Sequence, residues 1–588
     1  MSTYILGISC FYHDASAALL KDGVIVAAAE EERFTRKKHD SSFPVNAIEF
    51  CLKSEKITIG MVDYVGFYEK PFLKFERIMW QHLEMFPLSF KTYLSAMPSW
   101  INEKLRVPKL IRKALGYKKG VMFIEHHLAH AASAFLVSPF KKAAILTVDG
   151  VGEWTTTAYG IGNDKSIRLM KEIKFPHSIG LLYSTITAYL GFSVNNSEYK
   201  VMGLAPNGDM KKETNEYYEK LKNVIDIKND GSYKLQMEYF KFHFADRMPS
   251  KKLCKLLGGS IRKPNEPITQ RHKDIAAALQ LITEEVMTKI LKHLHKITKC
   301  ENLVLAGGVA LNSVYNGKII RSTPFKNVWI QPNSSDGGTS IGVASYIYHS
   351  ILNKERKFVM KHAYLGPKYS SKEVEIFLEK NKINYEKFKS QKEMIEATAK
   401  LIVKNKVIAW FQDRMEFGPR ALGARSILSN ACNPEMKDML NLKVKHREKF
   451  RPFAPVVTAE NTYEYFEADH PLQAATDFML MVYPVKEEKR KLIPAVTHVD
   501  GSGRLQTIKK YQNPDYYGLI REVEKKNNVP ILINTSFNIR GEPIVCSPFD
   551  AYKCVMGTGI DYLVMENFLI SREANSKDRW DSEKFAKD

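Results

Sequence analysis

Three short apolar runs, each followed by a polar turn, constrain the fold of this chain more than any other feature. They are residues 143–148, 302–306 and 328–330. Each run is too short for a typical helix and is bounded by turn residues, so each is predicted to be a buried strand. Two of the turns that follow contain a carboxylate, Asp149 or Asp336, and the third contains the pair Gly307–Gly308. Because cations and phosphates bind at such strand ends in α/β proteins, the pattern predicts strands interleaved with helices and a polar site at the strand ends.

Two histidines in an alanine-rich segment are the strongest candidates for metal ligands. His126 and His130 are four residues apart, so in a helix they lie one turn apart on the same face and can bind one ion. His127 points off that face and stands where a zinc protease has its catalytic glutamate, which argues against a metalloprotease. With Asp149 and Asp336, the two imidazoles form a predicted ligand set that suits Fe(II), Mn(II) or Zn(II) better than Ca(II).

The chain is predicted to open as a β-meander. Residues 4–9 are expected to form a strand, and Asp22–Gly23 between two apolar runs is a strong signal for a two-residue hairpin. The polar turn at 11–16 could hold phosphate with its backbone N–H groups and present His13 as a base. The charged run 30–40 is interpreted as a solvated loop.

A basic and aromatic segment, residues 71–115, is predicted to be a helical insertion broken by Pro87 and Pro98. It could shape an acceptor pocket, form a homodimer contact or face a membrane. Since an aromatic stripe at helical spacing is usually packed on its own domain, contact with a membrane ranks last among these roles.

Length and composition limit the remaining classes of protein. At 588 residues the chain can form two to four domains, and it has no apolar run long enough to span a bilayer. It begins without a basic, signal-like segment, and its seven cysteines include no Cys-x-x-Cys pair, so a cytoplasmic protein without disulfides is expected. The net charge of +22 is spread along the chain without a recognisable nucleic-acid-binding motif, so no nucleic-acid partner is expected.

A second module is predicted at 386–588, after a linker at 356–385. Its arginines and lysines stand amid glycine and proline at predicted strand ends, with asparagine and serine nearby. The four segments of this kind are 412–425, 443–455, 500–506 and 534–538. Guanidinium groups bind phosphate and carboxylate through two parallel hydrogen bonds, so these segments predict a site for an anionic substrate.

The motifs together resemble the NodU/CmcH family of O-carbamoyltransferases over nearly the whole chain. They are His-x-x-x-His at 126–130, Val-Asp-Gly at 148–150, Ala-Gly-Gly-Val-Ala-Leu-Asn at 306–312, Phe-Gly-Pro-Arg-Ala-Leu-Gly at 417–423 and Phe-Arg-Pro-Phe-Ala-Pro at 450–455. The resemblance implies an α/β architecture: an N-terminal duplicated actin-like ATPase (ASKHA-type) domain at 1–355, which includes the insertion 71–115, and a C-terminal YrdC-like domain at 386–588.

The resemblance also implies the reaction and its substrates. Carbamoyl phosphate and ATP, with Mg as co-substrate ion, would form a carbamoyl adenylate in the second domain. The first domain would pass the carbamoyl group to a hydroxyl of a sugar, a polysaccharide precursor or a secondary metabolite. A divalent metal, Fe(II) by the resemblance, would hold nucleotide phosphate and polarise the adenylate.

Site residues follow from the same resemblance. His13 would be the base for the acceptor hydroxyl, and Lys38 would offset charge on the leaving group. The residues expected at the nucleotide are Gly150, Gly152, Gly307, Gly308 and Asn312. Those expected to bind carbamoyl phosphate and ATP in the second domain are Arg420, Arg425, Lys445, Arg451, Arg504, Asn534 and Ser536. The spacing leaves open which of Lys443, Lys445, Arg447 and Lys449 provides the cation.

Two rival functions remain. A tRNA-modifying enzyme of the threonylcarbamoyl type agrees with the charge, but the lack of an RNA-binding motif argues against it. A non-catalytic, nucleotide-gated scaffold would bind nucleotide without turnover and would be indifferent to His126→Ala. The sequence does not name the acceptor.

Overall fold

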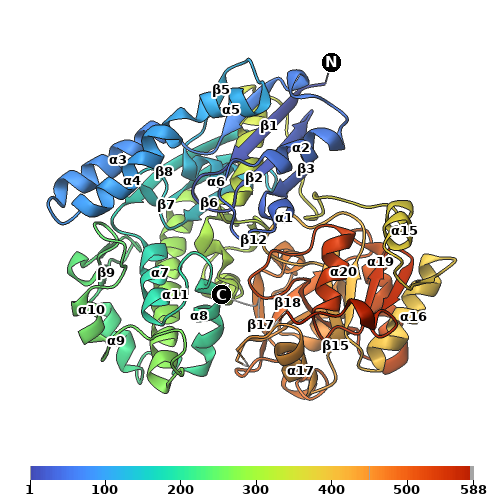
Figure 1. The fold of residues 1–588 in the computed structure, drawn as a ribbon. Helices are drawn as coiled ribbons and strands as arrows, with labels where there is room; N and C mark the ends of the chain where they lie inside the picture. Colours follow the sequence, from blue (N-terminus) through green and yellow to red (C-terminus); the bar gives the residue numbers. More distant parts are fainter. Residues whose placement is uncertain (1, 449, 583–588) are drawn as a thin grey trace. The chain divides into compact units, whose positions relative to one another are not determined.

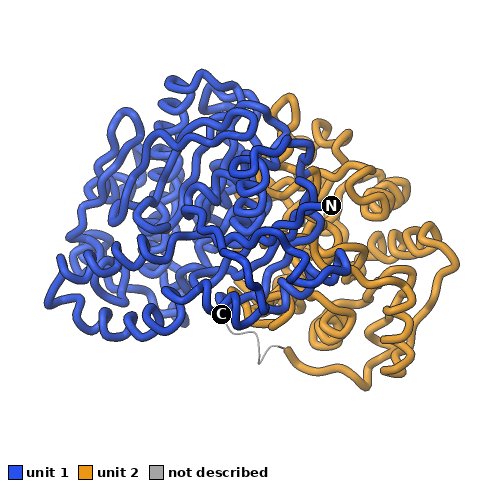
Figure 2. The backbone as a smooth tube through the Cα atoms, turned by 90° about the horizontal axis from the view of Figure 1, so that it is seen from above, with its two compact units in different colours: residues 1–31, 41–360 blue, residues 32–40, 361–588 orange. Residues whose placement is uncertain are grey.

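The computed structural model describes residues 2–448 and 450–582, which form two compact units. Residues 1–31 and 41–360 belong to the first unit, and residues 32–40 and 361–588 belong to the second (Figure 2). No helix among the described residues is both long enough and apolar enough to cross a membrane.

The first unit contains two five-stranded sheets of the same topology (Figure 1). In spatial order, the first sheet consists of β3 (Val24–Glu30), β2 (Ser16–Lys21), β1 (Tyr4–Ser9), β4 (Tyr64–Phe67) and β5 (Val121–Phe123). The second consists of β8 (Ser166–Lys174), β7 (Thr155–Asn163), β6 (Lys142–Val148), β11 (Asn302–Ala306) and β12 (Asn327–Ile330). In each sheet an antiparallel three-stranded meander is extended by two parallel strands, so the expected duplication is present.

The predicted hairpin joins β2 and β3. Asp22 and Gly23 both have positive φ, 49° and 87°, as a two-residue type I′ turn requires. The pair Asp22–Gly23 between two apolar runs was therefore sufficient to predict this hairpin.

Two buried helices pack between the sheets: α6 (His126–Phe135) and α14 (Thr339–Tyr346). Their close approach depends on glycine, because a Cβ at Gly342 would lie 1.9 Å from the Ala129 carbonyl oxygen. The longest helix, α11 (Gln270–Thr298), packs against β6 and β7 and leads into β11. The remaining helices of eight or more residues outside the insertion are α2 (Val45–Ser54) and α7 (Ile179–Tyr189).

The insertion between β4 and β5 is helical, as predicted, but only Pro87 separates helices, because Pro98 lies inside one of them. It contains α3 (Pro71–Glu84), α4 (Phe90–Asn102) and α5 (Val107–Leu115). The packing of α3 is the reverse of the expectation, because its buried face carries Lys74 and Arg77 whereas Phe72 and Trp80 are exposed.

The second unit is built on a nine-stranded mixed sheet. In spatial order its strands are β13 (Glu386–Lys387), β21 (Phe568–Ser571), β20 (Tyr562–Met565), β14 (Ile408–Phe411), β15 (Arg425–Asn430), β19 (Ile531–Ser536), β16 (Ala454–Thr458), β18 (Ser502–Ile508) and β17 (Met481–Pro484). Its main core lies between the sheet and two helices, α16 (Gln391–Val403) and α19 (Pro514–Asn527). Another helix, α20 (Pro548–Met556), packs on β14 and β20, and α17 (Met436–Lys443) follows β15.

The charged run 30–40 is not a solvated loop. Glu31 is buried and caps α2 by accepting hydrogen bonds from the backbone N–H groups of Asn46 and Ala47. The chain then enters the second unit, where α1 (Glu32–Thr35) places Arg33 so that it donates to the Gly418 carbonyl oxygen at 2.8 Å. Charge alone predicted exposure, but the carboxylates and guanidinium groups have buried partners.

The boundary between the units falls between Met360 and Lys361, inside the expected linker at 356–385. That stretch also contains α15 (Ser371–Lys380), which begins with a capping box between Ser370 and Glu373. Most of the predicted linker is therefore ordered structure of the second unit.

Candidate functional site

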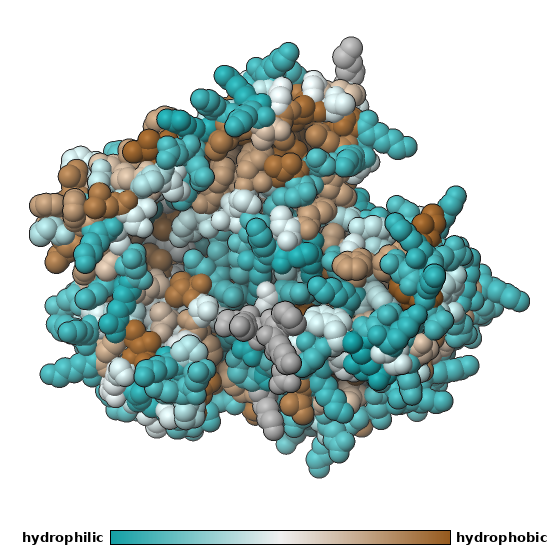
Figure 3. All heavy atoms as spheres, viewed as in Figure 1, coloured by the Kyte–Doolittle hydropathy of each residue, from teal (hydrophilic) through white to brown (hydrophobic). Residues whose placement is uncertain are grey.

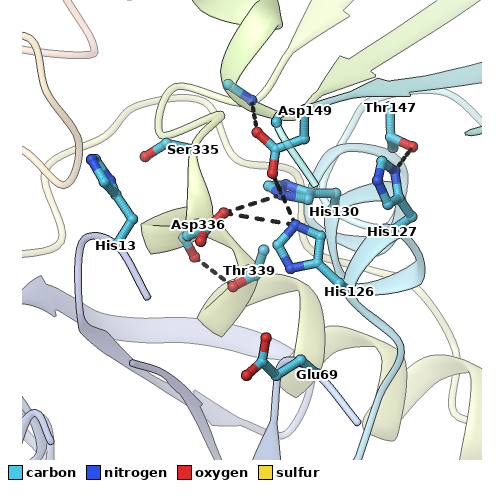
Figure 4. A network of polar contacts seen from close by, with 12 residues as sticks. His13, Glu69, His126, His127, His130, Thr147, Asp149, Ser335, Asp336 and Thr339 are labelled. Atoms are coloured by element: carbon cyan, nitrogen blue, oxygen red, sulfur yellow. Dashed lines mark hydrogen bonds and ion pairs between the residues drawn. The ribbon is translucent and has the colours of Figure 1, made fainter. Parts of the chain in front are cut away.

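The four predicted metal ligands converge in the first unit. His126 and His130 come from one face of α6, Asp149 follows β6, and Asp336 follows β12 (Figure 4). The Nε2 atom of His126 lies 2.9 Å from Asp149 Oδ2 and 3.7 Å from Asp336 Oδ1, and His130 Nε2 lies 3.6 Å from each of the same two oxygens. One donor atom from each residue lies within 4.8 Å of all the others. This spacing suits ligands that surround one ion.

Small residues make room for this cluster. A Cβ at Gly152 would come within 2.9 Å of the His126 ring, and a Cβ at Gly180 would come within 2.6 Å of the Asp149 carbonyl oxygen. Gly307 has a φ of 92°, and a Cβ there would lie 2.2 Å from the Val148 carbonyl oxygen. The glycines therefore allow the backbone around Asp149 to pack closely.

Burial without hydrogen bonds shows that the cluster is incomplete as a protein-only network. Both histidines are fully buried, and among the described residues the Nε2 atom of His130 and the Oδ2 atom of Asp336 have no hydrogen-bond partner. Burial opposes ionisation of Asp149, but the contacts of its Oδ2 with His126 Nε2 at 2.9 Å and His130 Nε2 at 3.6 Å outweigh it and hold the pKa of Asp149 well below its usual range. Two imidazoles and two carboxylates with unused donor atoms fit a divalent cation of the Fe(II), Mn(II) or Zn(II) kind.

His127 differs from its neighbours, as the helical spacing predicted. Its Nδ1 lies 2.7 Å from the Thr147 hydroxyl, and its Nε2 lies 2.9 Å from the Thr155 carbonyl oxygen. Burial, followed by the nearby His126, holds its pKa well below the ordinary value. His127 is therefore a neutral, fully bonded histidine that supports α6 on β6 and β7.

His13 lies in the turn between β1 and β2, where its ring is held from both sides. Its Nδ1 lies 2.7 Å from the Asp14 carboxylate, and its Nε2 lies 2.6 Å from the Asn195 carbonyl oxygen. Both partners are acceptors, so both ring nitrogens donate and the ring is positively charged. Burial lowers the pKa of His13, but Asp14 outweighs burial and raises it to about 10. The predicted base thus starts from its protonated form.

The glycines that were expected at the nucleotide lie around Asp149, whereas the expected asparagine is bonded elsewhere. Gly150 and Gly152 follow Asp149 beside α6, and the Gly308 N–H donates to the Asp149 carboxylate at 3.0 Å. Asn312 is buried, where it exchanges two hydrogen bonds with Gln280 and caps a short helix. Its amide is therefore used within the protein, which differs from the prediction that it lines the adenosine.

Lys38 belongs to the second unit, whereas His13 belongs to the first. Its charge contributes to lowering the pKa of Lys445, so the two cations are close. The segment that carries Lys38 is fixed by Arg36, which donates to the Pro543 and Ile544 carbonyl oxygens at 2.8 Å and 2.7 Å. From its position in the sequence, Lys38 was expected to belong to the first domain. A short segment that crosses into another unit leaves no periodic pattern in the sequence, so this crossing was not predicted.

Lys445 is the centre of the cationic group in the second unit. Its buried ammonium donates to the carbonyl oxygen of Ser536 and, at 2.9 Å, to the side-chain oxygen of Asn538. Burial lowers its pKa well below the usual value, and the charges of Arg447, Arg451 and Lys38 add to this. The structure thus favours Lys445 among the candidate cations; Lys449 lies outside the described residues. Asn538 was not singled out as a site residue, although it stands in the segment 534–538.

Arg425 does not face a substrate. It is fully buried, its guanidinium lies 3.6 Å from the centroid of the Phe411 ring, and its two terminal nitrogens donate to four main-chain carbonyl oxygens. Asn534 is buried too and donates to the Ala421 carbonyl oxygen at 3.0 Å. Arg425 therefore holds the loop before β15, which differs from its predicted role.

The other three predicted arginines are less buried. Arg451 forms an ion pair with Glu448 at 3.6 Å, and Arg504 lies on β18 near His498, whose pKa it helps to lower. Arg420 lies in the loop that also contains Gly418.

Comparisons with known proteins agree with the division of the chain into two units. Residues 4–345 match the family model described as Carbamoyltransferase N-terminus, and residues 399–572 match Carbamoyltransferase C-terminus. The chain is 45% identical to an uncharacterised protein of Synechocystis sp. over 97% of each chain. It is 36% identical to nodulation protein NolNO of Sinorhizobium fredii, over 97% of this chain and 80% of that protein.

Solved structures resemble the chain only weakly. Component A of the (R)-2-hydroxyglutaryl-CoA dehydratase of Acidaminococcus fermentans aligns with a TM-score of 0.33 and 10% identity, over 58% of this chain and 97% of that one. The family assignment therefore comes from the sequence matches, which extend across both units. On these matches, the chain belongs to the carbamoyltransferase family and is a carbamoyltransferase enzyme.

Proposed function

We propose that the protein is an ATP-dependent O-carbamoyltransferase that works in two half-reactions. In the first, carbamoyl phosphate, ATP and one water molecule give carbamoyl adenylate, pyrophosphate and phosphate. In the second, an acceptor hydroxyl attacks the carbamoyl carbon, the bond from that carbon to the AMP oxygen breaks, and AMP leaves. The acceptor is a sugar, a polysaccharide precursor or a secondary metabolite. Within this proposal the first unit is an actin-like ATPase domain, the second is YrdC-like, and the protein is cytoplasmic.

The cationic group of the second unit supports the first half-reaction. Lys445, Arg447, Arg451 and Lys38 are close enough that the other three lower the pKa of Lys445. Carbamoyl phosphate and ATP are both anions, and converging cations stabilise the charge that develops as phosphate and pyrophosphate leave. Lys445 is held by oxygen acceptors of Ser536 and Asn538, so its ammonium is already oriented.

The single observation that carries the second half-reaction is the four-ligand cluster with its unpartnered donor atoms. His126, His130, Asp149 and Asp336 would hold the ion, and Fe(II) is the proposed metal. Bound there, the ion would supply Lewis-acid polarisation of the nucleotide phosphate and the adenylate. The protein's own contribution is to fix the ligands on α6 and on the two strand ends.

His13 would take the proton of the acceptor hydroxyl. Asp14 holds the ring by its Nδ1 side, and Nε2 points at the Asn195 carbonyl oxygen at 2.6 Å. An acceptor hydroxyl that replaces this carbonyl contact would meet Nε2 of a His13 that has lost one proton. Asp14 then stabilises the imidazolium that forms when the proton arrives.

The experiment mixes the protein with ATP, carbamoyl phosphate and Fe(II) and measures pyrophosphate. Release of pyrophosphate that depends on carbamoyl phosphate is expected, and no release with Fe(II), Mn(II) or Zn(II) would contradict the proposal. Lys445→Met should abolish this release. His130→Ala should retain it and lose carbamoyl transfer, which a mass-spectrometric screen of candidate alcohols detects.

A further inference from the structure

An inverted helix borders the metal cluster. The face of α3 that packs on the first unit carries Lys74 and Arg77, of which only 3% and 5% is exposed, although helices usually bury their apolar face. Burying a cation costs free energy unless it is paired, so a buried cationic face needs an explanation.

Lys74 and Arg77 differ in what they contact. Lys74 is bonded to the Glu69 carboxylate and lies 4.3 Å from the centroid of the Tyr12 ring. Arg77 has no hydrogen bond or ion pair with any described residue, and its Nε is completely buried without a partner. Its guanidinium lies over the Phe175 ring, with the central carbon 4.8 Å from the ring centroid. Burial lowers the pKa of Arg77, and the charges of Glu69 and Glu153 act on it without a hydrogen bond or ion pair. A buried guanidinium with five unused N–H donors fits an absent anion.

Tyr12 connects these cations with the metal cluster. Burial raises its pKa; the charges of Lys74 and Arg77 lower it, while those of Asp336 and Asp149 raise it. Its hydroxyl is therefore within electrostatic reach of both groups. Tyr12 also precedes His13 in the turn after β1, and the neighbouring Tyr68 has a buried hydroxyl without a partner among the described residues. The Tyr68 ring lies 5.5 Å from the His126 ring, so Tyr68 adjoins the metal ligands.

We infer that the acceptor substrate is an anion: its carboxylate or phosphate group binds Arg77, with Lys74 and Tyr12 beside it, while its hydroxyl reaches His13 and the metal cluster. This inference rests on the proposed function. Arg77 offers two parallel N–H donors to either group, so the shared chemistry is an oxyanion with at least two free oxygens. The α3 insertion thus selects the acceptor, and neutral alcohols lack the group that it binds.

The first test uses stability, because a structural and a ligand-binding arginine differ there. Thermal unfolding is measured for the full chain, for Arg77→Met and for Arg112→Met, an exposed arginine of α5. Without ligand, Arg77→Met should be at least as stable as the native chain, since it removes an unpaired buried charge. Glucuronate and glucose 6-phosphate should raise the melting temperature of the native chain and of Arg112→Met by more than that of Arg77→Met. All three proteins have the same cations in the second unit, so binding of the probes there raises their melting temperatures equally.

A clear loss of stability in an Arg77→Met variant that still folds, or equal stabilisation of all three proteins by both probes, would overturn the inference. Should Arg77→Met not fold, Arg77→Lys keeps the charge and loses the two parallel donors. It is expected to fold and to bind both probes more weakly than the native chain.

The second test compares matched alcohols that differ only in the anionic group. They are glucose, glucuronate and glucose 6-phosphate, and glycerol, glycerate and glycerol phosphate. For the native chain and Arg112→Met, an anionic member should exceed its neutral analogue by about tenfold or more in kcat/KM, and Arg77→Met should lose that preference. The carboxylate and phosphate arms identify which oxyanion is preferred. Equal use of neutral and anionic alcohols would contradict the inference.

The same assay separates this inference from the proposed function. If the native chain releases no pyrophosphate, the proposed function fails, while the binding of the probes to Arg77 is still judged by the stability test. If Arg77→Met loses pyrophosphate release as strongly as it loses transfer, Arg77 serves the nucleotide and the inference about the acceptor is wrong.

The outward side of the same insertion independently indicates a partner. Large apolar side chains are exposed along α3, α4 and their connection, and they gather on one side of the molecule (Figure 3). This apolar face consists of Phe72, Trp80, Leu83, Phe86, Leu88, Phe90, Leu94 and Ile101, each at least half exposed. The interpretation that the aromatic stripe packs on its own domain does not hold for these residues.

Charge decides between the possible partners of this apolar face. Apart from the buried Lys74 and Arg77, residues 71–119 contain eight lysines and arginines but only three glutamates and no aspartate. Two copies of such a segment repel each other, whereas an anionic lipid surface attracts it, and exposed Trp, Phe and Leu beside basic residues are typical of interfacial membrane binding. We propose that the apolar face of α3 and α4 binds the surface of an anionic membrane.

Co-sedimentation with vesicles tests this proposal. The native chain should bind vesicles that contain phosphatidylglycerol, should not bind pure phosphatidylcholine, and should be released by high salt. Trp80→Ser with Phe86→Ser should lose at least about 90% of the binding, while the control pair Leu492→Ser and Tyr511→Ser, exposed in the second unit, retains it. Absence of binding to the anionic vesicles, or a dimer in solution that the Trp80 and Phe86 changes dissociate, would overturn the proposal.

Discussion

Two buried arginines, one in each unit, are matched in burial but opposite in bonding. Both terminal nitrogens of Arg425 donate to main-chain carbonyl oxygens, and its ring contact with Phe411 completes its surroundings. Arg77 is also buried, with 5% exposed against 0% for Arg425, but it donates to no described residue. The difference shows that burial and charge alone do not mark a ligand site. What marks it is a buried donor or acceptor that the protein leaves unused.

The same contrast separates two histidines of one helix. Both ring nitrogens of His127 have partners at Thr147 and Thr155, whereas His130 has no hydrogen bond on either nitrogen. They are three residues apart on α6, so their different roles come from the faces on which they lie. Substituting the two members of each pair, and comparing the effects, is the most direct test of the site.

His130→Ala should have the largest effect. The variant loses one of four convergent ligands, so we expect loss of bound Fe(II) and a decrease in carbamoyl transfer on the order of 10³-fold, about 4 kcal/mol in activation free energy. Elemental analysis and transfer kinetics measure the two losses. His127→Phe is the matched control, and it should keep the metal while losing about 1–3 kcal/mol of stability, because Thr147 and Thr155 lose a partner. Equal metal loss in both variants would contradict the assignment.

Arg425→Met is expected to destabilise the second unit strongly. Its removal leaves four main-chain carbonyl oxygens without their donor, and the free energy of unfolding should fall by about 3–5 kcal/mol. Urea unfolding of this variant and of Arg77→Met gives the loss in free energy of unfolding for each, so the two arginines can be compared directly. If Arg77→Met proves the more destabilising of the two, the distinction between bonded and unbonded arginines fails.

Sequence patterns predicted the parts of the site that local structure determines. The helical spacing of His126 and His130 and the position of Asp149 after an apolar strand were enough to bring three ligands together. Asp336 needed the parallel pairing of β12 with β11, which the apolar run at 328–330 indicated. The inverted packing of α3 and the transfer of Lys38 to the second unit could not be predicted, because both depend on contacts between segments far apart in the chain.

Asp14→Asn should shift the pH dependence of transfer by a smaller but directional amount. Asp14 raises the pKa of His13 to about 10, so a His13 that must accept a proton becomes active only as the pH rises toward that value. Without the carboxylate, the pKa should return toward the ordinary value of about 6.5, and the rising limb of kcat/KM should move to lower pH by more than about one unit. Asp22→Asn, an aspartate of the β2–β3 hairpin in the same unit, should leave the limb in place. An unshifted limb in Asp14→Asn would exclude His13 as the titrating base.

His498 tests whether an unpartnered buried atom is by itself enough to mark a ligand site, and its expected effect is the smallest. It has such an atom but no other ligands that converge on it. Its buried Nε2 has no partner among the described residues, and its Nδ1 lies 3.2 Å from the Ser502 hydroxyl. Its pKa is lowered to about 4, mainly by burial; Asp500 opposes the shift, and Arg504 adds to it. The unfolded chain, with an ordinary pKa of about 6.5, therefore binds the proton more readily than the folded protein does. The stabilisation is complete above about pH 6.5 and is lost as the pH falls toward 4. His498→Gln should flatten this part of the stability curve without changing metal content, and His470→Gln, at an exposed histidine of the same unit, should not flatten it. Loss of bound metal in His498→Gln would show that a single unpartnered atom is enough to disturb the cluster of the first unit, and the requirement for converging ligands would have to be abandoned.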